Sequence, residues 1–198
     1  GLARALKSSG VDTVKDLLNS FDEERLAEFK KPHGQQMHKV GKRASSILTM
    51  ARSINTRQEI MIEAPDIPES SNYVMFDLEG LPPQMDELEK IYLWGFQVFG
   101  EKPDEFKCGL AGFGHDGDRE GWEQFLKEAE RIFDEHGDIP WVHWHHYERV
   151  KIDMYLERYG DPDGVALRVK ENLLDLLPIT NKSIALPLPS YSLKVIEK

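Results

Sequence analysis

Cysteine and long apolar runs are nearly missing from this sequence. Its 198 residues include a single cysteine, Cys108, which excludes an internal disulfide and any multi-cysteine metal site. We expect Cys108 to be a passive strand or loop residue. No apolar run approaches the ~20 residues that a membrane span needs, and residues 1–4 do not begin an apolar signal-peptide block. We therefore expect a cytoplasmic protein without a membrane partner.

Positive charge is also scarce, and it is unevenly distributed along the chain. There are 25 Lys and Arg against 35 Asp and Glu, which gives a formal net charge of −10. Residues 1–60 nevertheless hold eleven basic and seven acidic side chains, whereas residues 61–198 hold fourteen basic and twenty-eight acidic ones. The basic first part is suited to nucleic acid phosphates, and the acidic second part would need metal ions to tolerate them.

The apolar pattern predicts a small all-α module over residues 1–60. Two short helices are expected within residues 2–18, and a third follows the N-cap signal at Ser20. A further helix is expected to begin near Gln35, because apolar residues recur at helical spacing: Met37, Val40, Ala44, Ile47 and Leu48. Residues 61–71, with two prolines, are expected to form an extended linker.

Parts of this module resemble helix-hairpin-helix repeats. The resemblance rests on SGVDTVKDLL, which follows spaced leucines, and on HKVGKRASSIL. Such repeats hold a nucleic acid backbone with helix N-termini and lysines, without reading its sequence. The resemblance implies contact with DNA or RNA by Lys39, Lys42 and Arg43. A plain helix bundle with surface lysines has the same pattern, so that interpretation remains open.

From residue 72 the periodicity becomes that of an α/β domain, which we place at residues 72–198. Trp94 and Trp122 fall on apolar faces and are expected in the core, whereas Trp141 and Trp144 either pack there or stack on a nucleic acid base. Three strands followed by a helix, a strand and a helix indicate a mixed sheet flanked by helices. The expected elements are strands at 73–78, 91–99 and about 105–113, a helix at 120–136, a strand at 139–144 and a helix at about 147–159.

Two carboxylates at the end of the first of these strands are the clearest indication of a functional site in the sequence. Asp77 and Glu79 are two residues apart, so in a strand they project from the same face. Like charges at that spacing repel unless a cation lies between them, and carboxylate oxygens suit Mg²⁺ or Mn²⁺ better than zinc. The alternative is an ordinary acidic strand end exposed to solvent.

A second polar cluster lies where the fourth strand passes into the next helix. It contains three histidines and a glutamate: His143, His145, His146 and Glu148. Ligands of open α/β sheets bind at the carboxyl ends of strands, so this cluster and the first carboxylate pair are expected to meet. That arrangement would suit phosphodiester hydrolysis by two metal ions. A zinc hydrolase using the histidines and Glu148 is a weaker alternative, because no further ligand has the required spacing.

These motifs together resemble the DEDD exonucleases of the ribonuclease H-like superfamily, and most closely the YprB-like predicted RecB-family nucleases. YVMFDLEG is similar to their first motif, with Gly80 where a threonine is frequent. VHWHHYERVKIDMYL is similar to their second motif, with His143 in the histidine place, Trp144 in the asparagine place, Tyr147 in the aromatic place and Glu148 in the acidic place. NLLDLLPIT places Asp175 at a further acidic position, and LPSYSLKVIEK resembles the start of a later helix.

The resemblance implies a ribonuclease H-like fold and a metal-dependent 3′-5′ exonuclease acting on DNA or RNA with two Mg²⁺ or Mn²⁺ ions. Asp77, Glu79 and Glu148 would be the catalytic metal ligands, with His143 and Asp175 supporting them. A final His or Tyr followed by Asp would lie beyond Lys198, so the domain is expected to be incomplete at its C-terminus. A helicase or a further nuclease domain is the partner expected in the full-length protein. The alternative function is a non-catalytic nucleic-acid-binding or scaffold domain.

Overall fold

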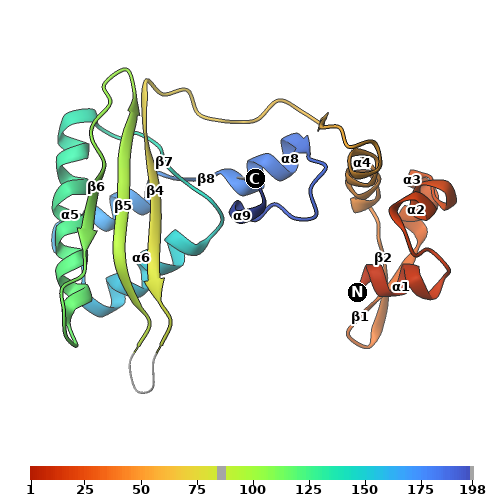
Figure 1. The fold of residues 1–198 in the computed structure, drawn as a ribbon, viewed down its shortest axis with the longest axis horizontal. Coiled ribbons are helices and arrows are strands. Elements are labelled where there is room, and N and C mark those ends of the chain that lie inside the picture. Colours follow the sequence, from red (N-terminus) through yellow and green to blue (C-terminus); the bar gives the residue numbers. More distant parts are fainter. Residues whose placement is uncertain (84–87, 197–198) are drawn as a thin grey trace. The chain divides into compact units, whose positions relative to one another are not determined.

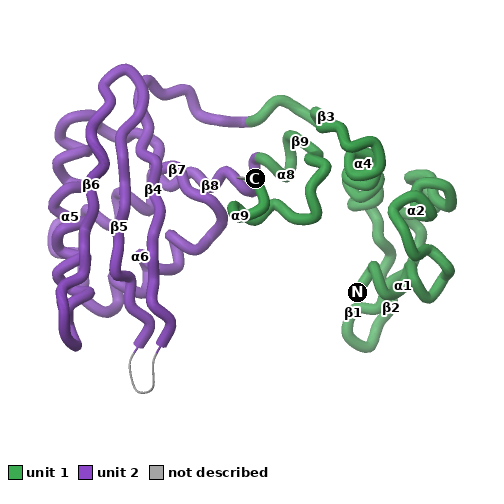
Figure 2. Tube along the Cα trace, viewed as in Figure 1, with its two compact units in different colours: residues 1–65, 180–198 green, residues 66–179 purple. Residues whose placement is uncertain are grey.

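The chain forms two compact units. The computed structural model describes residues 1–83 and 88–196. Unit 1 combines residues 1–65 with residues 180–198, and unit 2 consists of residues 66–179 (Figure 2). In the described part of the chain, no helix has both the length and the apolar character needed to cross a membrane.

Unit 1 is built from short helices around a small apolar core. Leu26, Ala44 and Leu48 are buried in this core, and Phe21 packs edge-on against Phe29. Thr13 and Asp16 form a capping box at the second helix, which satisfies two backbone N–H groups. The elements of unit 1 are α1 (Leu2–Ser8), α2 (Val14–Ser20), α3 (Glu23–Glu28), β1 (Lys30–His33), β2 (Gln36–Lys39), α4 (Arg43–Thr56), β3 (Ile60–Met61), β9 (Ile184–Ala185) and α9 (Leu193–Ile196).

The expectation of an all-α module with a helix from Gln35 is wrong. Strands β1 and β2 form an antiparallel hairpin, and α4 begins only at Arg43 (Figure 1). Gly34 has φ 60° at the first position of the two-residue loop, where type II′ hairpin turns take glycine. The apolar spacing from Val40 onward is helical and its residues are buried, but Met37 lies exposed on the hairpin.

The sequence predicts that residues 180–198 belong to the second domain. The structure places them in unit 1 instead. Strand β9 pairs antiparallel with β3, with Ile60 opposite Ala185. The hydroxyl of the fully buried Ser53 on α4 lies 3.0 Å from the Ala185 carbonyl oxygen and 2.7 Å from the Gln58 carbonyl oxygen, so the two acceptors share its proton. This pairing connects segments more than 100 residues apart, and local sequence patterns do not reveal it.

We expect Ser53→Ala to loosen residues 180–198 from unit 1. The substitution leaves the buried Ala185 carbonyl without its hydroxyl partner, which costs about 1–3 kcal/mol. Tryptic cleavage at Lys194 should become faster, as measured by mass spectrometry of timed digests. Ser46→Ala is the matched control, because Ser46 lies exposed on the same helix. Equal cleavage rates in both variants would contradict this role of Ser53.

Unit 2 is an α/β layer around a five-stranded mixed sheet with the order β6-β5-β4-β7-β8 (Figure 1). The first three strands in the chain pair antiparallel, and β7 and β8 then add parallel to β4. The expected α/β class and strand-helix order are therefore confirmed. The elements are β4 (Asn72–Leu81), β5 (Lys90–Gly100), β6 (Lys107–Leu110), α5 (Gly117–His136), β7 (Trp141–His143), α6 (Tyr147–Tyr159), α7 (Val165–Glu171), β8 (Leu173–Asp175) and α8 (Leu176–Ser183), which continues into unit 1.

One face of this sheet is covered by helices and forms an aromatic core. Trp94 of β5 contacts Phe125 of α5 and Tyr155 of α6, with ring centroids 4.8 and 4.9 Å apart. Trp122 and Trp141 are also buried, as expected for the first and as one of two alternatives for the second. Helices α5 and α6 therefore lie on the same face of the sheet, and β4 turns its other face away from them.

Candidate functional site

Strand β4 separates its carboxylates from the core by strict alternation. Phe76 and Leu78 are buried, whereas Asp77 and Glu79 are exposed on the face opposite to α5 and α6. A β-bulge between Glu79 and Gly80 interrupts the pairing with β5 directly after the second carboxylate. Bulges of this kind re-aim side chains and are frequent beside active sites. The predicted projection of Asp77 and Glu79 from one face is confirmed.

Tyr147, the first residue of α6, brings the second motif to the end of β4. Its hydroxyl lies where a Cβ atom on Gly80 would be only 2.6 Å away, so Gly80 leaves the space that this hydroxyl occupies. The pKa of the Tyr147 phenol is raised to about 12, first by burial and then by the negative charges of Glu89, Glu148 and Glu79. Acidic side chains from both sequence motifs therefore lie around one tyrosine hydroxyl.

Glu148 is buried and paired with His143. Nδ1 of His143, the last residue of β7, lies 3.0 Å from Oε2 of Glu148 in the first turn of α6. A carboxylate in the first turn of a helix is also favoured by the helix dipole. Glu148 therefore points into the protein, and its exposed fraction is 3 %.

Asp175 supports the loop between β7 and α6. Its Oδ1 accepts backbone N–H groups from His145, at 2.8 Å, and from Leu177, at 3.0 Å. His145 has φ 73°, which is unusual for a residue other than glycine, and the bond from Asp175 holds it there. Asp175 therefore stabilises the conformation of the loop between β7 and α6.

His145 and His146 contact each other and lie exposed. Nε2 of His145 is 3.0 Å from Nδ1 of His146, and the ring centroids are 3.9 Å apart. His143 is turned away from them toward Glu148. The three histidines of the motif are thus divided between a buried hydrogen-bonded pair of His143 with Glu148 and an exposed pair of His145 with His146.

The sequence analysis does not predict a second pair, formed by the half-buried Glu89 and the buried Lys151. The two charged groups are 2.5 Å apart, and the Lys151 ammonium lies 4.9 Å from the centre of the Tyr147 ring. A signal was present in the sequence, because Glu148, Lys151, Ile152 and Tyr155 follow the spacing of one helix face. Charged residues on an otherwise apolar stripe indicate buried partners.

The described residues fit only part of the implied metal site. Across residues 1–83 and 88–196, no three His, Cys, Asp or Glu side chains are grouped closely enough to hold an ion. Asp77 and Glu79 still provide the hard oxygen donors of a Mg²⁺ or Mn²⁺ ion, which often binds through two carboxylates, waters and substrate phosphates. A second ion does not fit this arrangement, because Glu148 is buried against His143.

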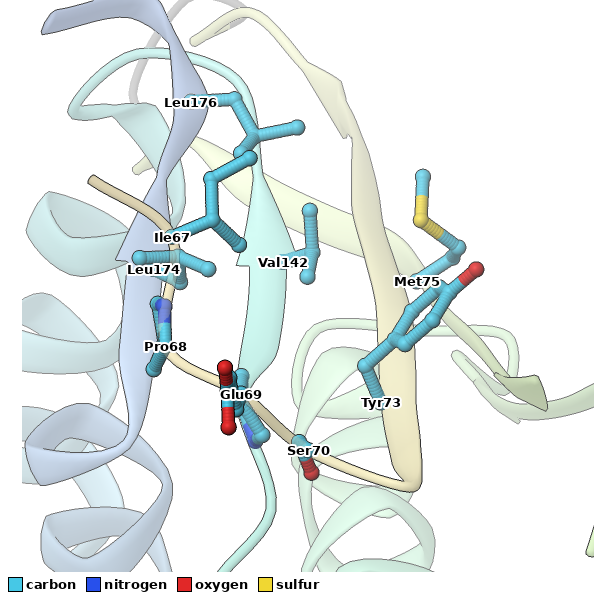
Figure 3. A pocket seen from close by; sticks show the side chains of 10 residues that line it. Ile67, Pro68, Glu69, Ser70, Tyr73, Met75, Val142, Leu174 and Leu176 are labelled. Carbon is cyan, nitrogen blue, oxygen red and sulfur yellow. The ribbon is translucent and has the colours of Figure 1, made fainter. Parts of the chain in front are cut away.

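The same face of the sheet also carries an apolar cavity of about 550 Å³ (Figure 3). Tyr73 and Met75 contribute to it from β4, on the same strand face as Asp77. Val142 and Leu174 come from the neighbouring strands, and the segment from Ile67 to Ser70 runs along its edge. Large apolar side chains thus lie next to the acidic end of β4.

The basic residues predicted to bind nucleic acid lie together in unit 1. Lys42 and Arg43 are exposed where α4 begins, and α4 has no side-chain N-cap bond. Lys39 lies at the end of β2 and pairs with Glu28 at 2.5 Å. The sequence predicts all three on the polar face of one helix; Arg43 is an exposed residue of α4, whereas Lys39 belongs to the hairpin.

Comparisons with known proteins give no family assignment. No protein-family model matches the chain, and no match was found among the curated proteins or the solved structures.

We expect Glu148→Ala to destabilise unit 2 by about 1–3 kcal/mol, because it leaves the buried His143 ring without its hydrogen-bond partner. Urea unfolding followed by tryptophan fluorescence measures this loss. Glu157→Ala on the exposed face of α6 serves as control and should change stability by less than about 0.5 kcal/mol. Similar stabilities for the two variants would refute the structural importance of the His143–Glu148 pair.

Gly80→Ala should displace the Tyr147 side chain, because a methyl group cannot occupy the position 2.6 Å from its hydroxyl. We expect a loss of about 1–3 kcal/mol in the free energy of unfolding, as for other overpacked sites. Gly95→Ala is the control on the neighbouring strand, since its new methyl group would lie 3.2 Å from the exposed Phe106 ring, which can move aside, and 3.6 Å from the Asp77 carbonyl oxygen, an ordinary contact. The close approach would be disproved by an undisturbed Tyr147 resonance in the nuclear magnetic resonance spectrum of Gly80→Ala.

Proposed function

We propose that unit 2 is a metal-dependent nuclease domain of the ribonuclease H-like type, which hydrolyses phosphodiester bonds of DNA or RNA as a 3′-5′ exonuclease. The observation that carries this proposal is the exposed pair Asp77 and Glu79 in the second half of the central strand. The pair lies on the open face of the sheet, and Tyr147 links its strand to the start of α6.

The sheet supports the proposed fold. Three antiparallel strands come first, and two parallel strands follow on the other side of β4, with helices between them. Asp77 and Glu79 are therefore on the strand that both halves of the sheet share. A central strand gives catalytic side chains a fixed position, which a loop would not give.

Asp77 and Glu79 would bind the ion and thereby set its position on the open face. A bound Mg²⁺ or Mn²⁺ would supply stabilisation of the charge that develops on the phosphate during hydrolysis. The two carboxylates have no cationic partner among the interactions found in the described residues, so they carry uncompensated negative charge toward solvent. This charge favours a cation and disfavours a phosphate that arrives without one.

Tyr147 and Lys151 would shape the other side of the site. Because the pKa of Tyr147 is about 12, its hydroxyl keeps its proton at neutral pH and can donate a hydrogen bond. Lys151, paired with Glu89, lies against the Tyr147 ring and restricts its movement. These residues would orient the substrate beside Glu79 without exchanging protons with it.

A non-catalytic nucleic-acid-binding or scaffold domain is the second candidate, and one observation favours it. Glu148, which takes the acidic place of the second motif, is buried against His143 and is closed to solvent. A domain that retained the fold and gave up hydrolysis would tolerate such a pair. Metal binding and cleavage separate the two candidates.

The test uses Asp77→Asn, which removes a charge from an exposed position and should leave the fold intact. We expect the wild-type chain to bind Mn²⁺ saturably in calorimetry and the variant to lose this binding. Cleavage of 3′-labelled DNA and RNA in Mn²⁺ should fall by about 10²-fold or more, as when other stabilising groups are removed from a reaction centre.

Glu171→Gln provides the matched control, because Glu171 is an exposed carboxylate at the end of α7 in the same unit. It should bind Mn²⁺ and cleave as the wild type does. Unchanged cleavage in Asp77→Asn would overturn the site assignment. Nucleic acid binding without any Mn²⁺ binding or cleavage in the wild type would favour the scaffold function.

A further inference from the structure

The β1–β2 hairpin has no evident structural purpose of its own. All eight of its strand residues except Lys31 are exposed, so the hairpin buries almost no apolar surface. An isolated two-stranded hairpin is at best marginally stable in water. Its presence therefore needs an explanation other than a contribution to the core of unit 1.

The base of the hairpin is nevertheless firmly attached to unit 1. The backbone N–H of Val40 donates to the Phe29 carbonyl, and that of Gly41 donates to the Ala27 carbonyl, both at 2.9 Å. Val40 is buried in the core, and Phe29 packs against Phe21. The unit thus holds the base of the ribbon in place and leaves its two strands to solvent (Figure 1).

The hairpin and the residues after it are basic without any acidic residue. Within residues 30–43 there are five basic side chains and no Asp or Glu, although the whole chain carries −10: Lys30, Lys31, Lys39, Lys42 and Arg43. Such a concentration of one sign attracts a polyanion.

The register places like charges opposite each other. Lys30 pairs directly with Lys39, and directly opposed like charges destabilise a two-stranded ribbon. Glu28 compensates only Lys39. A bound anion between the strands' charged side chains would remove this repulsion.

Both faces of the hairpin carry a lysine side chain. Consecutive strand residues point to opposite faces, so Lys30 and Lys31 project from different sides. Lys31 shares its face with His33 and His38, whose ring centroids are 4.9 Å apart. A ribbon with cationic side chains on both faces can reach the phosphates on both walls of a groove.

We propose that the β1–β2 hairpin binds the backbone of duplex DNA by entering its major groove. This groove admits a two-stranded β-ribbon, and phosphate contacts from lysines position a protein without reading sequence. The inference deepens the proposed function and rests on it for the choice of ligand. The contact itself needs neither a metal ion nor hydrolysis.

The test compares Lys30→Gln/Lys31→Gln with the wild-type full chain. Binding of a fluorescent DNA duplex is followed by anisotropy over a range of salt concentrations, with EDTA present so that cleavage does not contribute. Each lysine that contacts a phosphate adds about 1 to the slope of log affinity against log salt concentration. We expect the slope to fall by about 2 in the double variant, with unchanged circular dichroism.

The matched control is Lys15→Gln/Arg52→Gln, which removes the same charge from exposed positions on α2 and α4 of the same unit. Its salt slope should remain near that of the wild type. An equal fall in both variants would show a general charge effect and would overturn the inference. Tighter binding to single strands than to the duplex, or binding only to anionic phosphatidylserine vesicles, would also overturn it.

These outcomes are separate from those of the nuclease test. If Asp77→Asn loses cleavage but the duplex does not bind through the hairpin, the proposed function stands and this inference fails. If the hairpin variant loses binding while the wild type cleaves nothing in Mn²⁺, the inference stands and the nuclease proposal fails.

Discussion

The alternation of side chains along β4 is the constraint on which unit 2 depends. β4 is the central strand, and Phe76 packs against Phe125 of α5 and Trp141 of β7 from one of its faces. A slip of one residue would bring Asp77 and Glu79 into that aromatic core and expose the apolar residues between them. Burying two uncompensated carboxylates is so unfavourable that the register is fixed by the same residues that form the candidate site. One face of β4 therefore contributes to the stability of the core, and the opposite face carries the side chains of the candidate site.

The other half of the site follows a different rule, because its polar groups are mostly buried and must be paired. Glu148 is satisfied by His143, and Lys151 is satisfied by Glu89. Such pairs fix geometry well, but a carboxylate engaged in one is less available to a ligand. The exposed carboxylates of β4 are free of that restriction. Under the proposed function, this asymmetry would leave Asp77 and Glu79 more accessible to an ion than Glu148.

Features that depend on interactions between residues close in the sequence could be predicted, and features that depend on contacts between distant segments could not. The helix at residues 147–159 and the burial of Phe76 were predictable, since local periodicity determines both. The sequence does not predict the β1–β2 hairpin, because Met37, Val40 and Ala44 follow helical spacing although only the last lies in α4. The glycine at position 34, which the turn requires, was the contrary signal. The pairing of residues 184–185 with residues 60–61 depends on contacts across the chain, and no local pattern records them. The partner of Glu148 was likewise invisible, because its histidine is five residues away on another element.

The uneven charge of the chain makes the basic region at residues 30–43 and the carboxylates of β4 respond differently to salt and to metal ions. Residues 30–43 are purely basic, so contacts there release counterions and weaken steeply as salt rises. The carboxylates of β4 repel phosphate, and a polyanion can approach them only when a cation offsets their charge. The proposed nucleic acid contacts in unit 1 would thus be salt-sensitive, and the proposed reaction in unit 2 would depend on a divalent cation. Because the two requirements are independent, the proposed binding would not need a metal ion, whereas the proposed reaction at β4 would need one.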